Sequence, residues 1–328
     1  MIKIIEYKDL LEASKLMSIR WKKQSYFFPG IWQMHKNSIN NYSLYLKNRI
    51  NNENNMSMIE FKENSAVAVA ISQEITPPEV YDPGLTCLID SIVVKTSQIS
   101  KKAASNLLTE ITRIAERRGI VQNVIDVPIY EKFQAALLSS KNYSMCSKWW
   151  IGSSINYNIR NNSIDFTQQQ DIKFTVALSA LKRTQYEKVQ PLFWKKAVNS
   201  DQSQYEYFMQ ELHVSKQDDS HIIMLTYKDG KSVKGFITGY VKELPVEYEK
   251  KKICVIDDFM VLKPELWLSV GKELYLEMAY IAFKKGAVGI KVVCGTHDIP
   301  KIKLMQDLNL MLASNWWTKD IRAEFLGR

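Results

Sequence analysis

Two adjacent carboxylates interrupt an apolar run in the second half of the chain. Asp257 and Asp258 lie within residues 253–262, a segment otherwise dominated by the apolar side chains of a buried β-strand. Adjacent residues of a strand face opposite sides of a sheet, so one carboxylate can face a cleft while the other supports the fold. A carboxylate in a cleft could act as a general base, directly or through water, toward an ammonium group. The alternative for each is a structural role, as a hydrogen-bonded or loop-anchoring carboxylate.

His297 is the third candidate for proton transfer. It follows the apolar run at residues 288–294, at what would be the end of a strand. Because an imidazole changes charge near neutral pH, it could serve as a base or an acid, although a single histidine can equally be a surface or capping residue. Glu243 and Glu247 precede the strand that carries the two aspartates; they could hold a cationic substrate or be ordinary solvated loop acids. No metal-ligand cluster, Walker-type loop or catalytic-triad spacing occurs in the sequence.

The surroundings of Asp257 recur earlier in the chain. The offset is a constant 167 residues through a strand, a helix end and a tryptophan pair, as shown by Cys87 and Cys254 (254 − 87), Asp90 and Asp257 (257 − 90), Gly119 and Gly286 (286 − 119), and Trp149 and Trp316 (316 − 149). A constant offset through several kinds of residue indicates an internal duplication. Asp258 matches Ser91, and this asymmetry makes Asp258 the preferred catalytic candidate, since the recurring Asp257 could be a requirement of the fold. The recurring Trp-Trp pairs are interpreted as packing residues.

Hydrophobic periodicity and turn signals predict the same order of elements in each half. The first half is expected to form strands at residues 2–5, 56–61, 66–74, 86–94 and 121–127, helices after Asp9 and at 40–50, 101–117 and 130–139, and a last strand with the tryptophan pair. The second half is expected to form a strand near 172–178, helices at 184–197 and 202–213, strands at 221–227 and 233–241, and a final strand–helix–strand–helix–strand unit at 253–317. The predicted class is α/β, with domains at 1–160 and 161–328, each a mixed, mostly antiparallel sheet flanked by helices.

Length and composition are those of an ordinary two-domain protein, with 328 residues of which 46% are hydrophobic and 24% charged. The net charge of +9 fits either a basic surface or an anionic partner, most simply a phosphorylated cofactor, and no stripe of basic and stacking aromatic residues points to nucleic acid. The four cysteines lack close pairs, which fits a reducing compartment. Neither a signal peptide nor a membrane span is apparent, so a cytoplasmic location is expected. The aromatic residues within 21–32 are candidates for a substrate cleft or a domain interface.

The order of elements resembles the GNAT superfamily of N-acetyltransferases, present twice in tandem, over nearly the whole chain. The resemblance is strongest at Val255-Ile-Asp-Asp-Phe-Met-Val261 with the helix after it, and at Asp307-Leu-Asn-Leu310. It implies that acetyl-CoA binds where this strand ends and the next helix begins, because free backbone N–H groups and the helix dipole favour the pyrophosphate there. The second half is favoured as the cofactor site, and the residues implied are Met260, Val261, Leu262, Leu266, Leu268, Ser269, Val270, Gly271 and Lys272.

The loop after this strand departs from the family pattern, Arg/Gln-x-x-Gly-x-Gly/Ala. In the second half Ser269 and Gly271 stand on the glycine positions. A serine can still offer its backbone N–H, and the glycine allows a close approach to the backbone. In the first half Lys102 and Ala104 stand on those positions, and the bulk of the lysine would obstruct a backbone cradle.

The tyrosine that often serves the family as a general acid is replaced by Met305 in the second half and Leu138 in the first. The resemblance implies an acyl-CoA-dependent N-acyltransferase that moves an acyl group, with acetyl favoured, to the amine of a small molecule or peptide in a ternary complex. Two alternatives are a non-catalytic binding protein on a decayed fold and a transferase that uses aminoacyl-tRNA. A monomer with pseudo-dimeric domains and a homodimer are both compatible with the duplication.

Overall fold

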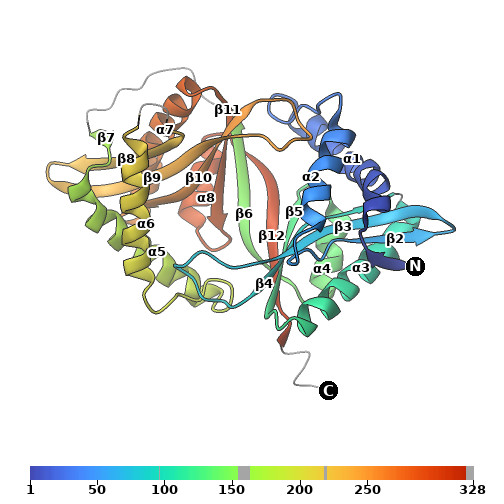
Figure 1. The fold of residues 1–328 in the computed structure, drawn as a ribbon. Coiled ribbons are helices and arrows are strands. Elements are labelled where there is room, and N and C mark those ends of the chain that lie inside the picture. The colour runs from blue at the N-terminus through green and yellow to red at the C-terminus, as the bar shows by residue number, and fades with distance from the viewer. Residues whose placement is uncertain (96, 154–162, 218–219, 323–328) are drawn as a thin grey trace.

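The computed structural model describes residues 1–95, 97–153, 163–217 and 220–322, excluding the side chains of 97–101, and its strands form one twelve-stranded sheet (Figure 1). The first half contains β1 (Ile2–Ile4), α1 (Leu10–Phe27), α2 (Ser38–Ile50), β2 (Met58–Lys62), β3 (Ser65–Ile75), β4 (Thr86–Val94), α3 (Ser97–Arg117), β5 (Gln122–Pro128), α4 (Lys132–Ser140) and β6 (Ser144–Ser153). The second half contains β7 (Ile164–Phe166), α5 (Ile172–Val189), α6 (Ser200–Ser215), β8 (Ile222–Asp229), β9 (Ser232–Glu243), β10 (Lys252–Val261), α7 (Lys272–Lys284), β11 (Ala287–Gly295), α8 (Ile299–Asp307) and β12 (Met311–Asp320). The α/β class and the repeated order of elements are thus confirmed.

The last strand of each half has crossed into the sheet of the other half. The strand order is β1-β2-β3-β4-β5-β12-β6-β11-β10-β9-β8-β7, so β12 pairs with β5 and β6 pairs with β11. Trp150 of β6 consequently lies in the core of the second half, while Trp317 of β12 packs against a core of the first half. The exchange joins the halves through continuous backbone hydrogen bonding. The division at residues 160/161 lies in a segment outside the described residues and stays a prediction.

The strand expected near residues 172–178 is wrong, because this segment forms the first turns of α5. Ile172, Thr175 and Leu178 lie on one buried face of this helix, at helical spacing, whereas Phe174 between them is exposed. A capping box between Gln168 and Asp171 starts the turn that leads into the helix. The edge strand of this half is β7 instead, which pairs antiparallel with β8.

A β-bulge occurs at the matching aspartate of each half. Along β10 the pairing with β9 passes from Ile256 directly to Asp258, so Asp257 is the extra residue; along β4 Asp90 is skipped in the same way. The parallel pairing of β10 with β11 ends at Ile256, and that of β4 with β5 ends at Ile89. Each half therefore has a bulge at the point where its two central parallel strands separate.

Helices cover both faces of the sheet. In the first half α1 and α2 pack on one face and α3 with α4 on the other, since alternate residues of β3 belong to two different cores. The α1–α2 core also receives Leu244 and Tyr248 from the loop between β9 and β10 of the second half. Each half thus depends on side chains from the other.

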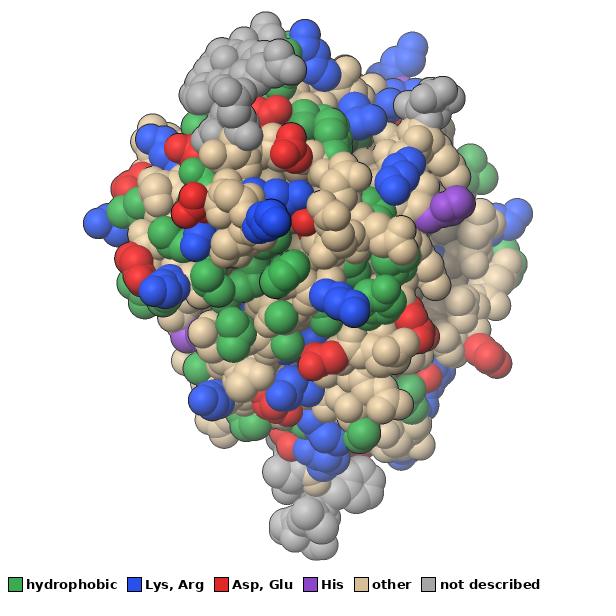
Figure 2. Space-filling model, turned by 90° about the vertical axis from the view of Figure 1, so that its left-hand side faces the viewer, with side chains coloured by type: hydrophobic (Ala, Val, Ile, Leu, Met, Phe, Trp, Pro, Cys, Tyr) green, Lys and Arg blue, Asp and Glu red, His purple; other side chains and the backbone are tan. Residues whose placement is uncertain are grey.

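The surface seen in Figure 2, on the side of α5 and α6, mixes the two signs of charge. Lys and Arg side chains are scattered among Asp, Glu and hydrophobic side chains over this face and do not gather into one stripe. Of the helices described, none is both long and apolar enough to cross a bilayer.

Candidate active site

A cavity of about 320 Å³ lies beside β10, between the two halves of the molecule. The second half lines it from α5, β9, β10 and the connection after α5, where Phe193 and Trp194 lie. The first half lines it from β4, β5, β6 and the loop at residues 76–85, which carries Tyr81 and three prolines. Most of the lining is apolar or aromatic. Among the described lining residues, the charged ones are Asp257 and Lys182.

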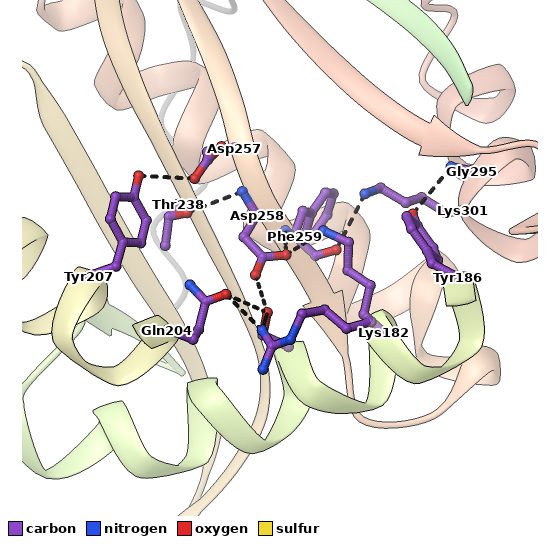
Figure 3. Close-up of polar contacts among 12 residues, drawn as sticks. Lys182, Tyr186, Gln204, Tyr207, Thr238, Asp257, Asp258, Phe259, Gly295 and Lys301 are labelled. Atoms are coloured by element: carbon purple, nitrogen blue, oxygen red, sulfur yellow. Dashed lines mark hydrogen bonds and ion pairs between the residues drawn. The ribbon is translucent and has the colours of Figure 1, made fainter. Parts of the chain in front are cut away.

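Asp257 reaches this cavity because it is the extra residue of the bulge. Its carboxylate accepts a hydrogen bond from the phenol of Tyr207 on α6, at 3.1 Å, and points away from Asp258 (Figure 3). The side chain retains contact with solvent, yet the surrounding protein raises the pKa of Asp257, and the adjacent charge of Asp258 adds to the effect. A carboxylate so placed is a better proton acceptor than an ordinary surface aspartate.

Asp258, preferred from the sequence, is turned toward α5 and is not among the lining residues of the cavity. Its two carboxylate oxygens bind the ammonium of Lys182 at 2.5 Å and the hydroxyl of Ser179 at 2.6 Å. Burial would raise the pKa of Asp258, but the charge and hydrogen bond of Lys182 hold it below the usual range. The carboxylate is therefore an ionised partner of a buried lysine, which fixes α5 to β10 and leaves no free position for a substrate proton.

His297 is not among the lining residues of the cavity and lies against the aromatic ring of Tyr186, with ring centres 4.7 Å apart. Neither ring nitrogen makes a hydrogen bond within the described residues, and burial lowers the pKa of His297. The ring packs over Gly295, where an added Cβ would lie 2.7 Å from the imidazole. These contacts favour a packing role.

A side chain from the last helix enters the space between the separated strands in each half. Lys301 of α8 is 1% exposed and donates to the carbonyl oxygen of Phe259 at 3.3 Å (Figure 3). Gln134 of α4 donates to the carbonyl oxygen of Ile92 at 2.6 Å. The two donors, and the two acceptors, are each related by the repeat offset (301 − 134 and 259 − 92). Lys301 also lies over the rings of Phe259 and Trp267, at 5.1 and 5.4 Å.

Solved structures similar to this chain include GCN5-related N-acetyltransferases. A GCN5-related N-acetyltransferase from Sphaerobacter thermophilus is similar over 98% of this chain and 95% of its own, with a TM-score of 0.58 and 11% identity. A GCN5-related glucosamine N-acetyltransferase region in a fungal multi-domain GH3 β-N-acetylglucosaminidase is similar over 97% of this chain and 38% of that chain, with a TM-score of 0.55 and 12% identity. The chain has the GCN5-related N-acetyltransferase fold. No model of a known protein family and no curated protein sequence matches it.

In this GNAT fold, most of the residues implied for cofactor binding lie in helical turns that lead into α7 and not in an open loop. A 3-10 turn at Pro264–Leu266 and a π-helical turn at Trp267–Gly271 run directly into α7. Gly271 is buried under Trp267, and an added Cβ would lie 2.8 Å from that ring, so packing explains this glycine. Leu262, Leu268, Ser269 and Lys272 are exposed, Leu266 is half-buried, and Met260, Val261, Val270 and Gly271 are buried. Their role in cofactor binding stays a prediction.

In the first half of the GNAT fold, fewer residues of the expected cofactor loop can be described. The side chains of residues 99–101, at the start of its loop motif, lie outside the described residues, whereas Lys102 is exposed and Ala104 is buried. Met305 and Leu138, on the family's tyrosine position, are both buried in apolar cores. The nearest phenol to the candidate base is Tyr207, which the sequence analysis did not single out.

Proposed function

We propose that this protein is an acyl-CoA-dependent N-acyltransferase that moves an acyl group, with acetyl favoured, to the amine of a small molecule or peptide. One observation carries the proposal. Asp257, a carboxylate of raised pKa, lies at a bulge on the wall of an aromatic cavity, where the central strands of a GNAT fold separate. Perturbed carboxylates in a cleft are candidates for general bases.

The residues of the chain can perform the acceptor side of this reaction. The carboxylate of Asp257 would take a proton from the substrate ammonium, giving the neutral amine and a protonated Asp257. Tyr207 holds the carboxylate in place through its hydrogen bond, and Phe193 and Trp194 would pack against the apolar part of the substrate. Bound coenzyme A would supply the acyl group as a thioester. Exposed Leu262 and Ser269 at the start of the helix would meet its outer part.

Lys301 decides whether the cofactor fits the inner part of this site. The family resemblance directs the arm of the cofactor between β10 and β11, where Lys301 now binds the Phe259 carbonyl. Its ammonium must leave that carbonyl before a ligand can take the same hydrogen-bonding position. In this proposal the outer part of the cofactor lies against the exposed residues at the start of α7, and its inner part enters only when Lys301 is displaced.

The same observation favours a second candidate function, a non-catalytic binding protein on the acyltransferase fold. In both halves the protein's own side chain, Lys301 or Gln134, donates a hydrogen bond to the backbone carbonyl at the point where the central strands separate. A protein that no longer binds a coenzyme would be free to fill both spaces. The two functions differ in whether acetyl-CoA binds at all.

Calorimetric titration with acetyl-CoA, followed by an assay for release of the free coenzyme thiol with tyramine as probe amine, separates them. The variants are Asp257→Asn and Lys301→Ala. Binding by the wild-type protein, with turnover lost and binding kept in Asp257→Asn, is the expected result. Unchanged turnover in Asp257→Asn would remove that residue from the mechanism. If neither the wild-type protein nor Lys301→Ala binds the cofactor at millimolar concentration, the remaining hypothesis is the non-catalytic binding protein.

A further inference from the structure

A larger cavity, of about 510 Å³, lies in the first half at the position equivalent to the candidate active site. The loop at residues 244–251 covers it, as the matching loop of the first half covers the other cavity. Both coverings use the same contact: the rings of Tyr248 and Trp32 are 5.0 Å apart, and those of Tyr81 and Trp194 are 5.2 Å apart. The two cavities are therefore counterparts in the duplication, built from both halves in mirrored roles.

Two ion pairs neutralise most of the charge in the larger cavity. Arg20 lies 3.2 Å from the carboxylate of Asp126, and Arg49 pairs with Asp90 at the bulge of β4. Each of these four side chains already has its counterion inside the protein.

Glu247 and Lys291 also line this cavity, and neither forms an ion pair within the described residues. Among these residues, the Glu247 carboxylate accepts a hydrogen bond only from its own backbone N–H. The Glu247 side chain enters from the covering loop; the residue is 9% exposed, and burial raises its pKa to about 7. The ammonium of Lys291 enters from β11 and lies 4.2 Å from the ring centre of Trp149, while burial lowers its pKa. Charged groups withdrawn from water are ordinarily paired. Glu247 is buried and Lys291 is half-buried, and without a counterion each remains available to a ligand.

The counterpart cavity shows that the fold does not require these two charges. Val80 stands at the position of Glu247 and Val124 at that of Lys291 (247 − 80 and 291 − 124). Val124 lines the smaller cavity as Lys291 lines the larger one. The acid and the base are thus particular to the first-half cavity, and apolar residues serve the same places elsewhere in the molecule.

The aromatic part of the wall would receive an apolar group. The rings of Trp21 and Tyr42 meet edge to face at 4.8 Å, and Trp32 with Tyr248 forms the second aromatic pair. We propose that this cavity binds a small zwitterion with an apolar body, of the α-amino acid class, whose ammonium pairs with Glu247 and whose carboxylate pairs with Lys291. The aromatic rings pack around the side chain of the ligand and further stabilise its ammonium.

Calorimetry with three related probes tests each contact separately. L-Phenylalanine carries both charges, phenethylamine only the ammonium, and N-acetyl-L-phenylalanine only the carboxylate. Glu247→Gln should weaken the binding of phenylalanine and phenethylamine about ten- to hundredfold and spare the acetylated probe, because a charge-assisted contact is lost. Lys291→Met should weaken phenylalanine and the acetylated probe and spare phenethylamine. Should either variant fold poorly, Glu247→Val and Lys291→Val follow the residues of the counterpart cavity.

The controls keep this proposal separate from the acyltransferase proposal. Asp257→Asn, in the other cavity, should leave phenylalanine binding unchanged, whether or not the protein has acyltransferase activity. Loss of phenylalanine binding in Asp257→Asn would place the ligand in the smaller cavity and overturn the proposal. Equal weakening of all three probes in both variants, or no binding of phenylalanine and L-leucine by the wild-type protein at about 10 mM, would overturn it as well.

Discussion

Replacing Asp258 by alanine would leave Lys182 as an uncompensated charge inside the protein. The two charged groups are 2.5 Å apart, and their side chains are only 9% and 10% exposed. The second carboxylate oxygen binds Ser179, which in turn accepts from Arg183 at 2.9 Å, so the loss extends beyond one contact. Removal of one partner of a buried ion pair costs about 3–5 kcal/mol. We expect Asp258→Ala to lose about that much free energy of unfolding.

Thermal unfolding followed by circular dichroism measures this loss. At about 2 °C per kcal/mol for a chain of this size, the midpoint should fall by roughly 6–10 °C. The matched control is the double variant Lys182→Met with Asp258→Leu, which removes both charges and should recover most of the stability. A midpoint of Asp258→Ala within about 2 °C of the wild-type value, or a double variant no more stable than the single one, would refute the structural role.

The pH dependence of the free energy of unfolding tests the contribution of this ion pair independently. The folded state lowers the pKa of Asp258, so its stabilisation is present at neutral pH and is lost as pH falls through that lowered value. The folded state raises the pKa of Lys182 through the charge of Asp258 in spite of burial, so its share is lost only at strongly alkaline pH. The stability difference between wild type and variant should therefore stay constant from about pH 5 to 9 and shrink in acid below the ordinary aspartate pKa of about 3.9.

Further outcomes follow from single side chains. Asp257→Asn should reduce turnover about 10²- to 10⁴-fold, the usual contribution of a general base, in the thiol-release assay. Lys301→Ala should tighten acetyl-CoA binding about tenfold in calorimetry if the lysine closes the path, and an unchanged affinity would contradict that role. Gly271→Ala should destabilise by about 1–3 kcal/mol in thermal unfolding, because its Cβ would lie 2.8 Å from Trp267. Glu247→Gln should be more stable than wild type above pH 7, by up to about 3 kcal/mol, with no difference below pH 4.5, since the folded state raises the pKa of Glu247 to about 7 and ionising it opposes folding.

The duplication makes most of the fold predictable from the sequence, and it also predicts the start of α5. Asp9 is a predicted helix start, and Asp171 holds the equivalent position before α5 (171 − 9 = 162), inside a matching capping box. A comparison of these two aspartates would have changed the strand expected at 172–178 into a helix. The exchange of β6 and β12 could not be found in this way. Both strands carry the same Trp-Trp pattern, so each suits either sheet, and only the three-dimensional pairing distinguishes them.

The strand that carries the candidate site was predictable, but not which of its two aspartates faces the cavity. The sequence located the pair Asp257 and Asp258 on the right strand, but strict alternation assumes a regular strand. The bulge inserts Asp257 as an extra residue. Asp257, which recurs as Asp90, therefore reaches the cavity, whereas Asp258 turns inward and forms the buried ion pair with Lys182. The partner that decides this, Lys182, is 76 residues away in sequence and has no motif of its own.

The two cavities show how a duplicated fold can keep its frame while its sites diverge. The other half has valine at both positions that match Glu247 and Lys291, and one of these, Val124, lines the counterpart cavity. An unpaired acid and an unpaired base each oppose folding, because the protein disfavours their charged forms. Stability therefore does not account for their presence, whereas a ligand that supplies both counterions would. Since the exchanged strands make one sheet of the two halves, such a ligand would bind to the same rigid frame that holds Asp257 at its bulge.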